Sequence, residues 1–154
     1  MPTSGCGLVS FDVTEKVDSQ TIPGSSTAAA SPSTLFETTI SVSSESLPRG
    51  SGLVDSVTLS RVTFNVRTPD KGNFDFAESA TLTITAPDNP NLSPVKIAEG
   101  TPTAGASTLT LQPTGDVNLL PYVRSGAVIR ASAVGRQPTT NVTFDGEVIL
   151  TVHF

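Results

Sequence analysis

Residues 141–154, NVTFDGEVILTVHF, constrain the fold of this chain more than any other segment. Every even-numbered position in it is apolar or glycine, and every odd-numbered one except Ile149 is polar or charged. Because side chains alternate between the two faces of a β-strand, this pattern predicts a long strand with one buried face. We expect it to be a central strand of a self-contained domain, whose apolar face supplies part of the core.

Shorter stretches of the same alternation recur along the chain, and 41 of its 154 residues are Ser or Thr. Thr favours strands and Ser favours turns, whereas no window carries a sustained helical stripe of apolar residues. We therefore predict an all-β fold, an antiparallel two-sheet β-sandwich of about eight strands, immunoglobulin-like or jelly-roll in topology. A chain of this length is one ordinary domain.

Within this single domain we expect three parts. Residues 1–24 form an N-terminal segment with the first strand, because Val9, Phe11 and Val13 alternate with polar residues. Residues 25–34, SSTAAASPST, are small and polar and predict a flexible connector. Residues 35–154 form the main β-sandwich.

The segment 54–66, VDSVTLSRVTFNV, changes the phase of its alternation. Val57 and Leu59 occupy odd positions, whereas the apolar residues after them occupy even ones: Val62, Phe64 and Val66. A strand shifts faces in this way only through an extra residue. A β-bulge is therefore expected near Ser60 and Arg61, with Leu59 and Val62 both directed into the core. The residues predicted to be buried there and elsewhere are Phe64, Leu82, Ile84, Val148, Leu150 and Val152.

Two irregular segments are also expected to bury apolar side chains. Phe74 and Phe76, in a loop, should close one end of the sandwich. The sequence LLPYV at 119–123 suits a single 3₁₀ turn that buries Leu119, Leu120 and Tyr122.

Charge and cysteine content exclude several classes of protein. The 9 basic residues are outnumbered by 14 acidic ones, which argues against a nucleic-acid partner. The single cysteine permits no internal disulfide. The sequence contains no run of 18 apolar residues, so it predicts no membrane-spanning helix.

Four segments of the chain carry a resemblance to known proteins: FDVTEKVDSQTIPG, VDSVTLSRVTFNV, NFDFAESATLTITA and DVNLLPYVRSGAVIRASAVGRQPTTNVTFDGEVILTV. In this order they resemble exported bacterial β-sandwich proteins of the myxobacterial type, which are often predicted lipoproteins of unassigned function. The resemblance implies a sandwich fold and export to the periplasm, the outer-membrane surface or the extracellular space. It implies no enzymatic activity.

Proteins of this group usually begin with a signal peptide that ends at a lipid-modified cysteine. In TSGCG, the small residues Ser4 and Gly5 precede Cys6, which is therefore the candidate for lipid attachment. Thr3 stands where Leu is usual, and no charged or apolar signal segment precedes it, so that a free thiol is the alternative. Cys6 is the only residue through which the sequence offers membrane anchoring.

We predict no catalytic residue and no cofactor. His153, the only histidine, falls on the polar face of the terminal strand and is expected to face solvent rather than to serve a Ser–His–Asp triad. The one metal candidate is the loop PDKGNFD, where Asp70, Asn73 and Asp75 offer the oxygen ligands that Ca²⁺ prefers. Their spacing matches no known calcium loop, and the same residue types are ordinary turn formers.

The sequence thus predicts that the protein is not an enzyme but a non-catalytic exported envelope or cell-surface module with a structural or binding role. One alternative is a subunit of a surface polymer or larger assembly, in which the N-terminal segment is donated to a neighbour's sheet. A more distant one is a carbohydrate-active enzyme or glycan-binding module. A protein and a glycan both stay open as partners, and we expect a monomer rather than a strand-exchanged polymer.

Overall fold

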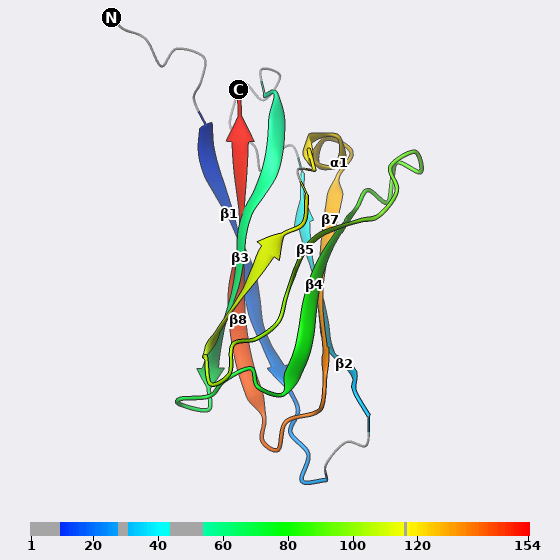
Figure 1. Cartoon of the computed structure of the whole chain (residues 1–154). Helices are drawn as coiled ribbons and strands as arrows, with labels where there is room; N and C mark the ends of the chain where they lie inside the picture. Colours follow the sequence, from blue (N-terminus) through cyan, green and yellow to red (C-terminus); the bar gives the residue numbers. More distant parts are fainter. Residues whose placement is uncertain (1–9, 28–30, 44–53, 116) are drawn as a thin grey trace, which may run out of the picture.

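The computed structural model describes residues 10–27, 31–43, 54–115 and 117–154. These residues form eight strands and one short helix (Figure 1). The elements are β1 (Ser10–Ile22), β2 (Ser33–Val42), β3 (Ser56–Thr68), β4 (Ala77–Thr85), β5 (Val95–Gly100), β6 (Thr108–Pro113), α1 (Leu120–Arg124), β7 (Ala127–Gly135) and β8 (Val142–His153). Every strand pair is antiparallel, so the predicted all-β antiparallel class is confirmed.

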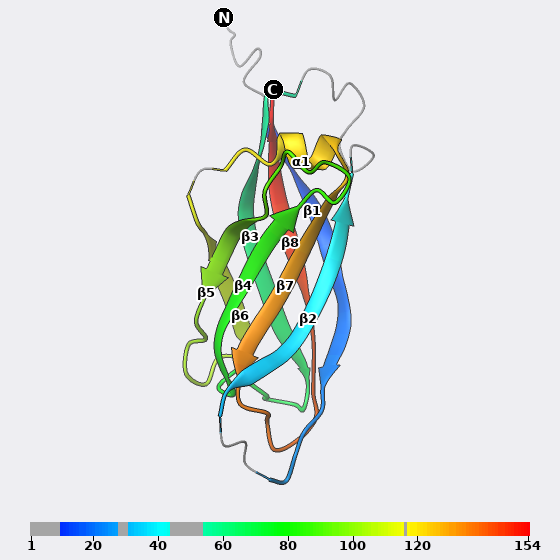
Figure 2. The ribbon, with the colours of Figure 1, turned by 90° about the vertical axis from the view of Figure 1, so that its right-hand side faces the viewer.

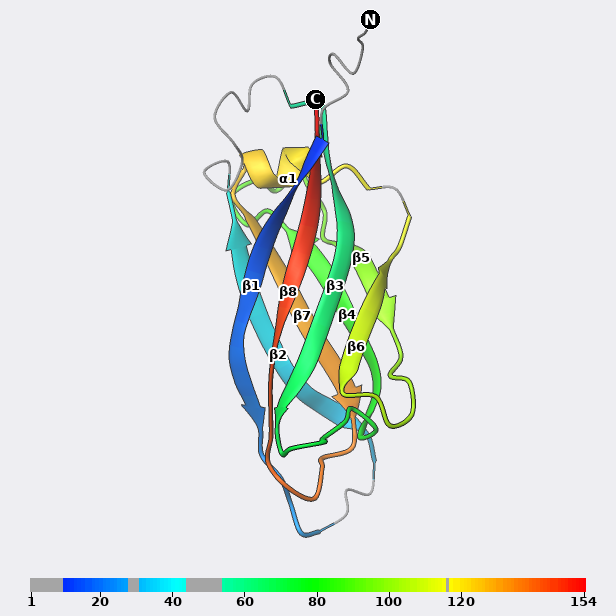
Figure 3. The same ribbon diagram turned by 90° about the vertical axis from the view of Figure 1, so that its left-hand side faces the viewer.

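The strands pair by a simple rule, in which each strand of the first half meets its counterpart from the second half. β1 pairs with β8, β2 with β7, β3 with β6, and β4 with β5. Further pairing of β3 with β8 and of β4 with β7 builds two four-stranded halves, which face each other in Figures 2 and 3.

The sequence predicts two separate sheets, but the structure joins the two halves. A short pairing of β5 with β6, Ala98 opposite Pro113 and Glu99 opposite Gln112, joins them. The result is one eight-stranded sheet of order β1-β8-β3-β6-β5-β4-β7-β2. Alternation along a strand predicts which face is buried, but this joining depends on backbone pairing between β5 and β6, which alternation does not encode.

The core lies between the two halves and contains all six residues predicted for it, each with at most 1% of its surface exposed: Phe64, Leu82, Ile84, Val148, Leu150 and Val152. Aromatic rings connect the halves across this core. The ring centroid of Phe36, on β2, lies 4.5 Å from that of Phe144 on β8. The ring of Phe144 also lies 5.8 Å from Phe64 and 6.1 Å from Phe74.

The expected bulge in β3 is confirmed. Leu59 lies opposite Leu150 and Arg61 opposite Ile149, so that Ser60 is the extra residue. Leu59 packs against the core and Val62 is fully buried, as the phase change required.

The segment at 119–123 buries Leu119, Leu120 and Tyr122 as predicted, but as an α-helical turn rather than a 3₁₀ turn. The N–H of Val123 donates to the carbonyl of Leu119, 2.9 Å away, which is the spacing of an α-helix. The Tyr122 hydroxyl donates to the carbonyl of Ser93 at 2.7 Å and so satisfies the one polar atom of this buried side chain.

The N-terminal part of the chain belongs to the same sheet. β1 is an outer strand that pairs with β8 from Ser10 opposite His153 to Ile22 opposite Val142. β2 begins at Ser33, so the last two residues assigned to the connector at 25–34 are already paired with β7. β1 also contains a register shift between Val17 and Gln20, which the sequence had not indicated.

Candidate functional site

The calcium candidate residues lie together in the loop between β3 and β4, where the side chains of two of them accept hydrogen bonds from the backbone. Asn73 Oδ1 accepts a hydrogen bond from the N–H of Asp75 at 3.0 Å. Asp75 Oδ1 accepts one from the N–H of Gly105 at 2.8 Å, while Asp70 is exposed. Within the described ranges no three His, Cys, Asp or Glu residues are grouped closely enough to hold a metal ion. Cys6, the lipid-attachment candidate, lies outside the described residues.

His153 lies in β8, half-exposed, opposite Ser10 of β1 and Ser56 of β3. Its ring Nε2 is 3.2 Å from the hydroxyl of Thr58, with which it shares a hydrogen bond. The surroundings of this histidine are therefore those of a side chain on the outer face of a sheet.

The structure reveals a cleft that the sequence had not indicated, at the end of the molecule where β3 leads into β4 and β7 into β8. It has a volume of about 580 Å³ and lies between the loop at 69–76 and the loop at 136–141. Pockets that bind small molecules typically measure about 300–1,000 Å³. Turn residues are dense in both loops, PDKGNFDF and RQPTTN, but only the sheet order makes these loops neighbours.

Backbone contacts bring the two loops together. The N–H of Arg136 donates to the carbonyl of Phe76 at 2.9 Å. The residue before it is Gly135, and a Cβ at that position would collide with the same carbonyl, so only glycine permits this close approach. The loop after β1 adds two further bonds, from Ser25 N–H to the carbonyl of Pro138 and from Gly24 N–H to Asn141 Oδ1, at 2.9 and 2.7 Å.

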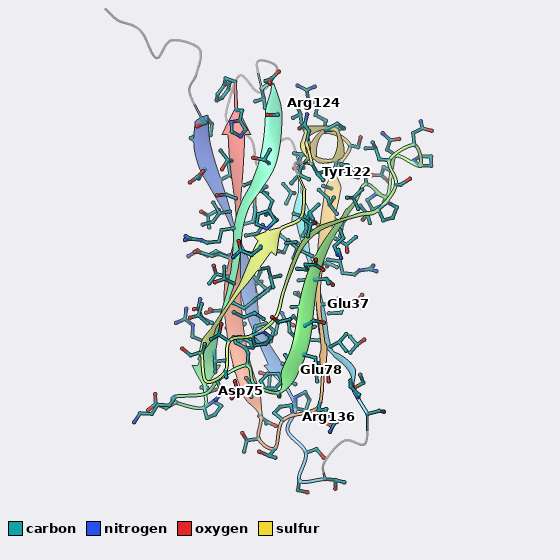
Figure 4. The ribbon with its side chains drawn as sticks, viewed as in Figure 1. Glu37, Asp75, Glu78, Tyr122, Arg124 and Arg136 are labelled. Atoms are coloured by element: carbon teal, nitrogen blue, oxygen red, sulfur yellow. The ribbon has the colours of Figure 1, made fainter. Side chains whose placement is uncertain are left out.

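The cleft combines an apolar surface with charged side chains. Phe76 is half-buried, and Pro138 and Val142 are buried. The charged residues are Asp75, Glu78 and Arg136, all exposed, which Figure 4 shows at the same end of the molecule.

A second depression, of about 410 Å³, lies on the outer face of β1, β8 and β3 around Gly146. Arg67 Nε lies 2.8 Å from Asp145 Oδ2, and this hydrogen-bonded ion pair raises the pKa of Arg67 above its ordinary value. The Arg67 side chain is 58% exposed, and exposed ion pairs of this kind contribute little to stability. Lys16, Asp18 and Glu147 add mixed charge to this outer face.

Comparison with known proteins finds no matching protein-family model and no matching curated protein. Among solved structures, the chain is similar to the decameric BFDV capsid protein, with 12% identity and a TM-score of 0.48, over 96% of this chain and 99% of that one. It is also similar to a chain of Desmodium yellow mottle tymovirus, with 10% identity and a TM-score of 0.24, over 100% of this chain and 93% of that one. Within the described residues, no helix is both long and apolar enough to cross a membrane.

Proposed function

We propose that this chain is a non-catalytic, exported envelope or cell-surface module with a jelly-roll sandwich fold and a structural or binding role. The pairing of β1 with β8, β2 with β7, β3 with β6 and β4 with β5 supports the jelly-roll topology, because it is the pattern of one long antiparallel ribbon rolled up on itself.

The placement of the polar side chains carries the non-catalytic part of this proposal. In the described part of the chain every buried side chain belongs to an apolar residue or to Tyr122, whose hydroxyl is bonded to a backbone carbonyl. Asn73 and Asp75, whose side chains could take part in chemistry, instead accept hydrogen bonds from backbone N–H groups and so stabilise their loop. Catalytic groups, in contrast, are characteristically desolvated and have strongly perturbed surroundings.

The resemblance of the four quoted segments to exported bacterial proteins supports the cellular location. A test is to express the gene with its natural upstream sequence in a Gram-negative host and to fractionate the cells. We expect the protein in the periplasm, the outer-membrane fraction or the medium. Recovery in the cytoplasmic fraction alone would contradict export.

Intact mass of the mature protein tests the anchor in the same cells. If Cys6 is the lipid-attachment residue, the mature chain begins at Cys6 and carries added acyl chains. An unmodified mass, or a chain that still begins before Cys6, would show that Cys6 is a free thiol. A Cys6→Ser variant is the control, because it should lose the acyl mass and leave the membrane fraction.

The alternative of an assembly built by strand donation requires β1 to leave its own chain. Pairing of β1 with β8 of the same chain, over the length of both strands, favours the self-contained module.

A further inference from the structure

Three polar side chains line the cleft between the β3–β4 loop and the β7–β8 loop. Each forms one hydrogen bond and has another polar atom without a hydrogen bond among the described residues. Asn73 and Asp75 each use Oδ1 to accept a backbone N–H, and Gln137 Nε2 donates to the carbonyl of Pro23 at 2.8 Å. Among the described residues, no hydrogen bond engages Asn73 Nδ2, Asp75 Oδ2 or Gln137 Oε1. The cleft therefore presents one donor group and two acceptors on side chains that are already oriented, which lowers the entropic cost of binding.

Glu78 and Arg136 extend this set with charged groups. Both side chains are exposed, and neither forms an ion pair or hydrogen bond with another described residue. Glu78 lies at the start of β4, and Arg136 directly follows β7, the strand that pairs with β4 (Figure 4). Glu78 therefore offers the cleft a hydrogen-bond acceptor, and the Arg136 guanidinium offers several donors.

The apolar part of the cleft lies among these groups. It is contributed by the half-buried ring of Phe76 and by Pro69, Pro138 and Val142. The ring of Phe76 packs against the hydrophobic core, and its centroid lies 6.1 Å from that of the buried Phe74 ring. The apolar surface is therefore anchored to the core.

This mixture selects among ligand classes. A metal cation needs acceptors alone, a phosphate or sulfate needs donors alone, and a purely apolar ligand would leave the polar atoms unpaired. A sugar offers hydroxyl groups that both donate and accept, together with an apolar C–H face that packs on an aromatic ring. Two carboxylates against one guanidinium disfavour an acidic sugar.

We propose that this cleft binds a neutral oligosaccharide, with Phe76 as the packing surface and Asn73, Asp75, Glu78, Arg136 and Gln137 as the hydrogen-bonding groups. The site deepens the binding role proposed above and rests on it.

Titration of the purified, ¹⁵N-labelled chain, followed by NMR, tests the site. The probes are maltotriose, chitotriose, trigalacturonate and calcium chloride, each raised to about 10 mM, a range that detects dissociation constants in the millimolar range. We expect at least one neutral trisaccharide to shift the amide signals of residues 69–78 and 136–142. The proposal is overturned if no neutral trisaccharide shifts these amide signals, or if the shifts lie elsewhere on the surface. It is also overturned if trigalacturonate binds more tightly than both neutral sugars, or if calcium is the only probe that shifts the signals of this loop.

Substitution of exposed charges separates binding from folding. Arg136→Gln and Glu78→Gln should each weaken the binding of the active trisaccharide by about tenfold, since each removes a charged hydrogen-bonding group. The matched control is Arg124→Gln in α1, an exposed arginine at the opposite end of the molecule, which should change the affinity by less than about twofold. All three variants should keep the melting temperature of the parent chain. Equal affinity in Arg136→Gln and Arg124→Gln would place the sugar outside this cleft.

Mass spectrometry of the sugar after the titration distinguishes this site from the proposed function. An intact trisaccharide agrees with both proposals. A cleaved trisaccharide would confirm a saccharide site and contradict the non-catalytic role, whereas failure to bind leaves the fractionation result, and with it the proposed export, unaffected.

Discussion

Gly146 interrupts the apolar face of β8 at a position where an added side chain would collide with β3. It lies opposite Phe64, and a Cβ at this position would be 2.5 Å from the carbonyl oxygen of Thr63 and 2.6 Å from the Phe64 ring. We expect Gly146→Ala to lower the free energy of unfolding by about 1–3 kcal/mol, because the ring and the β3 backbone must move. Urea denaturation measures the change. The control is the adjacent Glu147→Ala, which should cost less than about 0.5 kcal/mol, and equal costs would show that the ring accommodates a methyl group.

Leu150 reports whether the even-numbered face of β8 carries the stability of the core. It is 1% exposed, whereas the next residue in the N-terminal direction, Ile149, is half-exposed on the other face. Leu150→Ala should cost about 2–5 kcal/mol, from lost burial and the cavity that remains. Ile149→Ala is the matched control and should cost clearly less. A denaturant midpoint that moves more for Ile149 than for Leu150 would contradict the assignment of the inner face.

At the scale of the elements, alternation predicted an all-β fold of about eight strands, because buried and more exposed side chains alternate along strands such as β7 and β8. β5 does not follow this rule, since its consecutive residues Ile97 and Ala98 are both buried. The same local rule located the bulge at Ser60, since a phase change within β3 is visible without any partner. The shift between Val17 and Gln20 in β1 was missed because four polar residues separate the buried odd-numbered Val17 from the buried even-numbered Ile22, so the change of parity rests on two residues alone. The one-turn helix was assigned the wrong type because five residues carry too short a pattern to distinguish α from 3₁₀ geometry.

The cleft depends on which elements become neighbours, and this could not be predicted from local pattern. In an antiparallel fold the connections after β1, β3 and β7 all reach the same end, but only pairing of β4 with β7 brings Phe76 beside Arg136. Taken one at a time, the polar residues of the cleft are of the types that commonly form turns. Their spare polar atoms come together only because the pairing of β4 with β7 places the loop at 69–76 beside the loop at 136–141.

At the scale of the whole molecule, the two ends carry different elements. Figure 1 shows β1 beginning and β8 finishing at the end that carries α1, while the connections from β3 to β4 and from β7 to β8 lie at the other end. The first residue of β1 is Ser10, four positions after Cys6. The proposed sugar-binding cleft lies at the end opposite to the one where β1 begins.

The outer strand β1 decides between a self-contained module and an assembly subunit. Within the chain it contributes the buried residues Val17 and Ile22 and covers one edge of β8. We expect the intact protein to be a monomer at every concentration in light scattering. Deletion of residues 1–24 should lower the melting temperature and expose the edge of β8, an unpaired strand edge of the kind that promotes aggregation. A donated strand predicts the reverse: polymers of the intact chain that grow with concentration, through head-to-tail contacts, and that disappear when residues 1–24 are removed.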